Sequence, residues 1–165
     1  MYRKDTGRTG ITDERLSFPM KLKWRYTCAQ VPRPAWPNPP RLYNKMDFDF
    51  APHPVVAEGR VYICSNSDDT LRVLDAHTGK QLWRFTAGGP LRFAPQAHKG
   101  RVYLSSDDAH IHCLDSRTGK PIWEFNAAPE NEMFIGNGRM ISRWPIRTGI
   151  LVEADVLYAV AGMWP

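Results

Sequence analysis

The sequence predicts an all-β protein: a β-propeller of four-stranded blades, with two complete blades and partial blades at both ends. Three observations lead to this prediction. The motif Asp-x-x-Thr-Gly-Lys-x-x-Trp begins at Asp75 and again at Asp115, 40 positions later. Gly-Arg-Val-Tyr precedes each copy, and a Phe follows each Trp by two residues. A repeat of about 40 residues that holds several short strands is typical of propeller blades, which stack to bury a continuous core.

Each copy contains short runs of β-forming residues separated by turns. The runs are rich in Val, Ile, Leu, Tyr, Trp and Phe, whereas Ser, Asn, Asp and Gly gather between them. In the first copy the predicted strands are residues 60–64, 71–74 and 81–85, and a fourth run, residues 91–98, leads into the next copy.

Incomplete copies flank the two complete ones. Residues 22–26 are predicted to be the last strand of a preceding blade, and in residues 149–162 Tyr158 matches Tyr103. We therefore expect an incomplete piece of a larger propeller. Its predicted parts are a lead-in and last strand (1–26), a Pro-rich insertion (27–50), two blades (51–90 and 91–130), a Gly/Arg-rich loop (131–148) and the start of a further, truncated blade (149–165).

The repeated motif, with Gly-Arg-Val-Tyr before it, resembles the propeller repeat of pyrroloquinoline-quinone (PQQ) dehydrogenases and their non-enzymatic relatives. In that family the Trp docks between neighbouring blades, and the Asp and Thr-Gly turn holds it. The resemblance implies a bacterial protein that is periplasmic or secreted. It also implies structural docking roles for Asp75, Thr78, Gly79, Trp83, Asp115, Thr118, Gly119 and Trp123.

Composition excludes several other classes of protein. The net charge is +5, and Lys and Arg form no long run of the kind that tracks a nucleic-acid backbone, so no nucleic-acid partner is expected. No apolar stretch is long enough to span a bilayer, and residues 1–20 lack the apolar core of a signal peptide. Cys28, Cys64 and Cys113 form no Cys-x-x-Cys motif, so we predict neither a zinc site nor an attached haem.

Clusters of His and Asp are interpreted as structural. His110 and His112 share one side of a strand and could form half a metal site, but no carboxylate is fixed by local spacing to complete it. The Asp pairs at 68–69 and 107–108 fall in predicted hairpin turns, where Asp bonds to the backbone. We therefore assign no metal site and no catalytic residue.

The connection to the third copy is the strongest candidate for a binding loop. Tyr103 and Tyr158 are 55 positions apart, against 41 for Tyr62 and Tyr103, and long connections are often functional. Arginines beside an indole can bind a carboxylate, phosphate or sugar by forked hydrogen bonds and stacking. Alternatively, the arginines satisfy loop carbonyls and the indole packs beneath the loop. The candidate ligand-binding residues are Asn137, Arg139, Arg143, Trp144 and Arg147.

The Pro-rich insertion is a second candidate surface. Trp36 and Tyr43 could make it a recognition element, or the insertion could pack across a blade edge.

Three functions remain open. The first is a non-catalytic scaffold or binding module of an extracytoplasmic bacterial protein, without a cofactor, binding a protein, peptide or carbohydrate at its loop face. The second, implied by the resemblance, is part of a PQQ-dependent dehydrogenase with PQQ and calcium in a central channel. The third is a propeller of outer-membrane assembly that binds partner strands. Family enzymes usually carry adjacent cysteines, which this sequence lacks, so the first is favoured.

The docking assignment predicts unequal effects of two substitutions. Trp123→Ala should lower the free energy of unfolding by about 3–5 kcal/mol because it opens a cavity in the core, whereas Arg143→Ala should not. Thermal melting of both variants measures this, and equal losses would contradict the assigned roles.

Overall fold

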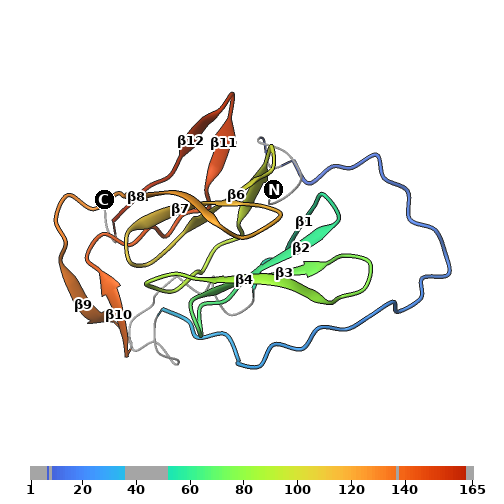
Figure 1. Cartoon of the computed structure of the whole chain (residues 1–165), viewed down its shortest axis with the longest axis horizontal. Helices are drawn as coiled ribbons and strands as arrows, with labels where there is room; N and C mark the ends of the chain where they lie inside the picture. Colours follow the sequence, from blue (N-terminus) through green and yellow to red (C-terminus); the bar gives the residue numbers. More distant parts are fainter. Residues whose placement is uncertain (1–6, 8, 36–51, 137, 163–165) are drawn as a thin grey trace.

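The computed structural model describes residues 7, 9–35, 52–136 and 138–162, which form strands, turns and extended segments. Figure 1 shows two four-stranded sheets and two shorter hairpins. The predicted all-β architecture is therefore confirmed. None of the described residues belongs to a helix that is long and apolar enough to cross a membrane.

The two sequence copies form two sheets of the same design. Each is an antiparallel meander in which consecutive strands are neighbours. In the first sheet Val73 lies opposite both Tyr62 and Trp83. The first sheet comprises β1 (Val55–Ala57), β2 (Arg60–Cys64), β3 (Thr70–Asp75) and β4 (Gln81–Thr86), and the second comprises β5 (Gln96–His98), β6 (Arg101–Ser105), β7 (His110–Asp115) and β8 (Pro121–Asn126).

The third copy supplies two strands. β11 (Leu151–Glu153) and β12 (Val156–Tyr158) form an antiparallel pair in which Leu151 lies opposite Tyr158. Residues 22–26, in contrast, are extended but join no sheet within the described part of the chain.

The strand predictions need two corrections. Of residues 91–98 only the last three form a strand, β5, which opens the second sheet. Residues 131–148 are not simply a loop, because they contain the hairpin of β9 (Met133–Gly136) and β10 (Arg139–Ser142). Apolar residues on both sides of Gly-Asn-Gly are a hairpin signal, and Gly138 has the positive φ that such a turn requires.

The core lies between the sheets, as stacked blades require. Tyr62, Leu71 and Val73 of the first sheet pack in one cluster with Val102 and Leu104 of the second. A second cluster joins the second sheet to the segment that contains β11. All three cysteines are free thiols, and the two on strands are buried as small apolar residues; burial raises the pKa of the Cys64 thiol.

Candidate functional site

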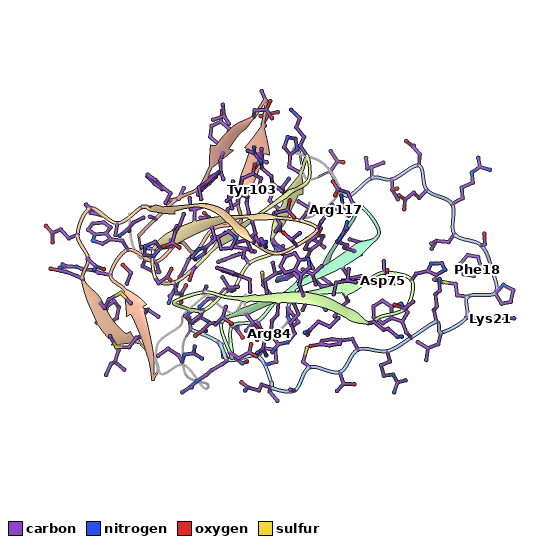
Figure 2. All side chains as sticks on the ribbon, in the orientation of Figure 1. Phe18, Lys21, Asp75, Arg84, Tyr103 and Arg117 are labelled. Atoms are coloured by element: carbon purple, nitrogen blue, oxygen red, sulfur yellow. The ribbon has the colours of Figure 1, made fainter. Side chains whose placement is uncertain are left out.

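The Asp-x-x-Thr-Gly turn is closed by one carboxylate oxygen. Oδ1 of Asp75 accepts hydrogen bonds from the N–H of His77 at 3.0 Å, from the N–H of Thr78 at 2.7 Å and from its hydroxyl at 2.8 Å. The bonds from Thr78 stabilise the charged form and so lower the pKa of Asp75. Asp115 and Thr118 repeat the arrangement with the same distances. Figure 2 labels Asp75 at the end of the first sheet.

An indole from a segment earlier in the chain packs on each of these turns. The N–H of Trp83 donates to the carbonyl of Ser116 at 3.3 Å, and the ring packs on Gly119, where a methyl group would lie 2.5 Å from Cε3 of the indole. Gly119 also has a φ of +71°, a conformation that side chains other than hydrogen disfavour. The turn therefore requires glycine for two independent reasons.

Trp24 is a docking residue that the sequence analysis missed. Its N–H donates to the carbonyl of Ala76 at 3.1 Å, and a methyl group on Gly79 would lie 2.6 Å from the ring. The signal was present, because Lys-Trp-Arg-Tyr around Trp24 repeats the spacing of Leu-Trp-Arg-Phe around Trp83. Trp24 thus packs on the docking turn of the first sheet as Trp83 packs on that of the second.

Trp123 holds the equivalent place in the second sheet but differs in its surroundings. Its ring centroid lies 5.9 Å from that of Tyr103, close to the 6.4 Å between Trp83 and Tyr62. Its exposed fraction is nevertheless 37%, and no Asp-x-x-Thr-Gly turn covers it among the residues described. The cavity cost predicted for Trp123→Ala therefore applies to a chain in which this site is filled.

The β2–β3 and β6–β7 turns lie at the opposite ends of their strands from the docking turns, and we call this side the loop end. The Pro-rich insertion and the Gly/Arg-rich segment 131–148 both make contacts on this side. The N–H of Arg33 donates to Oδ1 of Asn66 at 2.9 Å, and the N–H of Ser142 donates to the carbonyl of Asp107 at 2.8 Å. The described part of the Pro-rich insertion and the segment 131–148 therefore both contact the loop end.

A buried group of three charged side chains holds the segment 131–148 against the second blade. Asp107 lies between the guanidinium groups of Arg92 and Arg147, at 2.7 Å and 3.1 Å. The side chains of Arg92, Asp107 and Arg147 are only 2%, 1% and 9% exposed. Charges removed from water in this way are stabilised by their partners. In this conformation Arg147 has a structural role, because its ion pair with Asp107 holds the segment after β10 against the second blade.

The other predicted loop residues do not converge on one point. Arg139 pairs with Asp69 and donates to the carbonyl of Ser67 at 2.7 Å. Arg143 forms an exposed ion pair with Glu132 at 2.7 Å. Trp144 is half-buried, and its indole N–H has no hydrogen-bond partner among the residues described. Asn137, Trp36 and Tyr43 lie outside the described residues. Ligand binding by this set stays a prediction.

The two strand histidines share a carboxylate. Their rings stack with centroids 6.0 Å apart. Nε2 of His110 and Nδ1 of His112 lie 3.4 Å and 3.3 Å from the two oxygens of Glu124. Burial lowers the pKa of His112. In the part of the chain that the structure covers, no three His, Cys, Asp or Glu side chains are placed to hold a metal ion.

Comparison with known sequences identifies one matching family. The family model described as "Outer membrane protein assembly factor BamB" matches residues 22–159. A search of curated proteins found no match.

Solved structures share the fold. BamB from Moraxella catarrhalis is 22% identical, with a TM-score of 0.50 over 66% of this chain. Quinohemoprotein alcohol dehydrogenases from Pseudomonas putida HK5 and Comamonas testosteroni are 18% and 21% identical, each with a TM-score of 0.54 over 66% of this chain. The chain spans 29% of that BamB chain and 16% of each dehydrogenase chain. At these identities the likeness shows the β-propeller fold alone.

The indole contact at Gly119 can be measured by two matched substitutions. Gly119 and Gly100 have the same φ of +71°, but a methyl group on Gly100 meets nothing within 4 Å. Gly119→Ala should therefore lower the free energy of unfolding by about 1–3 kcal/mol more than Gly100→Ala, through overpacking against Trp83. Denaturant titration gives both values. Equal losses would mean that backbone conformation alone selects glycine here.

Removal of the buried carboxylate tests the fastening of the loop end. Asp107→Asn removes the buried negative charge that lies between the guanidinium groups of Arg92 and Arg147 and should cost about 3–5 kcal/mol. Asp155→Asn, which removes the exposed ion pair to Lys99, is the control and should change stability little. Chemical denaturation of both variants checks this, and a small effect at Asp107 would refute the structural role.

Proposed function

The chain belongs to the PQQ-repeat propeller family whose model is described as outer membrane protein assembly factor BamB, and from this premise we propose that it is a non-catalytic scaffold and binding module. In this proposal the module acts outside the cytoplasm of a bacterium. Its partner is a protein that presents an extended segment to the hairpin of β9 and β10 at the loop end.

The observation that carries the proposal is that the β9–β10 hairpin exposes large apolar side chains and is tied to both blades by ion pairs. Ile135 and Met140 lie opposite each other on β9 and β10, and both are exposed, as are Met133 and Phe134. Large exposed apolar residues that lie side by side favour a protein contact. β9 pairs only with β10 within the described residues, so its outer edge is available to a partner strand, whereas the edge of β10 is partly used by the bond from Ser142 to Asp107.

The support comes from ion pairs on both sides of β10. Arg139, next to the turn of the hairpin, is held by Asp69 of the first blade, and Arg147, beyond the end of β10, is held by Asp107 of the second. The hairpin is thus tied to both blades, which limits the conformational entropy that binding would otherwise cost. In this proposal the loop arginines position the surface and do not contact the partner.

The alternative of a PQQ dehydrogenase requires a calcium site built from free oxygen ligands. Three of the four turn carboxylates at the loop end are paired with arginines, and the fourth, Asp108, lies 3.3 Å from Nδ1 of His110. Asp68 pairs with Arg72, Asp69 with Arg139, and Asp107 with two guanidinium groups. This set of paired donors does not fit a calcium ion, and we derive no redox step for this chain.

A labelled peptide tests the proposed surface. The probe is a peptide of about ten residues in which Val or Phe alternates with Ser or Thr, the pattern of a donated strand. Fluorescence anisotropy should show binding to the full chain, and Ile135→Asp should weaken it at least about tenfold by placing a charge in the contact. Ile11→Asp is the control, because Ile11 is as exposed as Ile135, at 71% against 74%, but lies on the N-terminal segment.

Two outcomes would overturn the proposal. One is equal weakening by Ile135→Asp and Ile11→Asp, which would indicate non-specific adsorption. The other is an absence of peptide binding together with PQQ- and calcium-dependent reduction of a dye, which would favour the dehydrogenase.

A further inference from the structure

Four titratable side chains lie in contact along the second sheet. Glu124 of β8 is directly opposite His112 of β7, so these two side chains and that of His110 share one face of the sheet. Nδ1 of His110 is 3.3 Å from Oδ1 of Asp108, and its Nε2 is 3.4 Å from Oε1 of Glu124. Nδ1 of His112 is 3.3 Å from Oε2 of Glu124. Carboxylates and imidazoles therefore alternate in an unbroken series.

His112 lies where the first and second blades meet, and both of these sheets have all four strands. Its ring centroid is 5.1 Å from that of Phe85 on β4, and Figure 1 shows β4 beside the second sheet. Phe85 packs in turn against the core cluster that the two sheets share. The side chain of His112 is only 6% exposed, whereas that of His110 is 24% exposed. His112 is thus part of the packing between the blades, and His110 borders the solvent.

The two histidines differ in the acceptors that their nitrogens meet. Nδ1 of His110 lies 3.0 Å from the carbonyl oxygen of Asp108, and its Nε2 faces Glu124, so both nitrogens have an acceptor. Nδ1 of His112 faces Glu124, but its Nε2 is buried and has no hydrogen-bond partner among the described residues. A neutral imidazole carries a single N–H. In His112 this N–H is therefore on Nδ1, and the unprotonated Nε2 needs no acceptor.

A proton added to His112 would turn Nε2 into a charged donor inside the contact between the blades. A buried donor without an acceptor is costly, and a buried charge is more costly still. The groups that face the ring are Asp108 from the β6–β7 turn, His110 on β7 and Glu124 on β8, together with the apolar Phe85 on β4 and Leu104 on β6. None of them supplies an acceptor to Nε2. Water can supply one if the ring moves away from Phe85.

We propose that the contact between His112 and Phe85 is an acid-sensitive switch between the first and second blades. When the ring of His112 takes up a proton, the contact opens, Nε2 reaches water, and β4 separates from the second sheet. The strands β2 and β6 stay together, because Tyr62, Val102 and Leu104 remain packed in the shared core cluster. This inference is independent of the proposed function, since it concerns a contact within the chain and needs no partner.

The direction of the pH effect follows from the pKa of His112. Burial lowers this pKa below its ordinary value of about 6.5, and the like charge of a protonated His110 acts in the same direction, whereas Asp108 and Glu124 raise it. A group whose folded-state pKa is lowered contributes stability that is fully present above its unfolded pKa and is lost as the pH falls through the folded value. The contact is therefore closed at neutral pH and weakens as the pH falls below about 6.5.

Hydrogen exchange of the full chain, followed by mass spectrometry at about pH 7.5 and about pH 5, tests the switch. After correction for the intrinsic rate, the amides of β4 should exchange several-fold faster at the lower pH, whereas those of β2 should not. His112→Leu should abolish the difference, because leucine fills the contact and takes up no proton. His77→Leu is the matched control, since His77 is exposed, and should leave the difference unchanged.

The protonation of the unaltered chain is followed by long-range ¹H–¹⁵N NMR of the histidine rings. At about pH 7.5 the ring of His112 should be neutral and carry its proton on Nδ1. On acidification it should take up the second proton below about pH 6.5, the ordinary value for histidine, together with the faster exchange of β4. Far-UV circular dichroism and melting curves establish that the chain and each variant are folded at both pH values.

Three results would overturn the proposal. The first is exchange of β4 that does not depend on pH, or that rises in acid together with that of β2, which would mean that the whole chain opens. The second is a pH dependence that His112→Leu retains or His77→Leu removes. The third, which needs no variant, is a neutral His112 that carries its proton on Nε2.

Discussion

The packing of an indole on a turn glycine is the contact on which the rest of this structure depends. A four-stranded meander has two faces and cannot bury both alone. The Trp83 contact joins two such sheets at one end of their strands, by a hydrogen bond to Ser116 and by the ring on Gly119. Because both sheets have the same register, this one contact also aligns their opposite ends. The loop end exists as a surface for that reason.

At the loop end, opposite the docking turns, buried ion pairs rather than indole packing hold the segments together. Asp107 and its two arginines come from three separate segments, and each would be costly to bury without the others. Their mutual dependence favours one arrangement of the connections over its alternatives. Arg139 and Arg147, which the sequence offers as ligand-binding residues, form ion pairs within the protein instead. The proposed partner surface therefore consists of the exposed apolar residues of β9 and β10.

Local spacing explains how much the sequence could predict. The turn of Asp75 and Thr78 is formed by residues at most three positions apart, so its geometry could be inferred from the motif. The pairing of Arg147 with Asp107 joins residues 40 positions apart, and no local pattern encodes it. The β9–β10 hairpin is signalled locally, by apolar residues on both sides of Gly-Asn-Gly, but the arginines of the same segment also fit a ligand-binding loop, which is the interpretation the sequence analysis gave.

The proposed loop-end surface places few demands on the sequence of a partner. A free strand edge with apolar side chains accepts many extended segments, because main-chain hydrogen bonds supply much of the affinity. In the proposed function, selectivity therefore has to come from side-chain contacts with the exposed apolar residues of β9 and β10, such as Ile135 and Met140. The docking turns work in the opposite way, because a carbonyl at the indole N–H and a glycine beneath the ring are both required there.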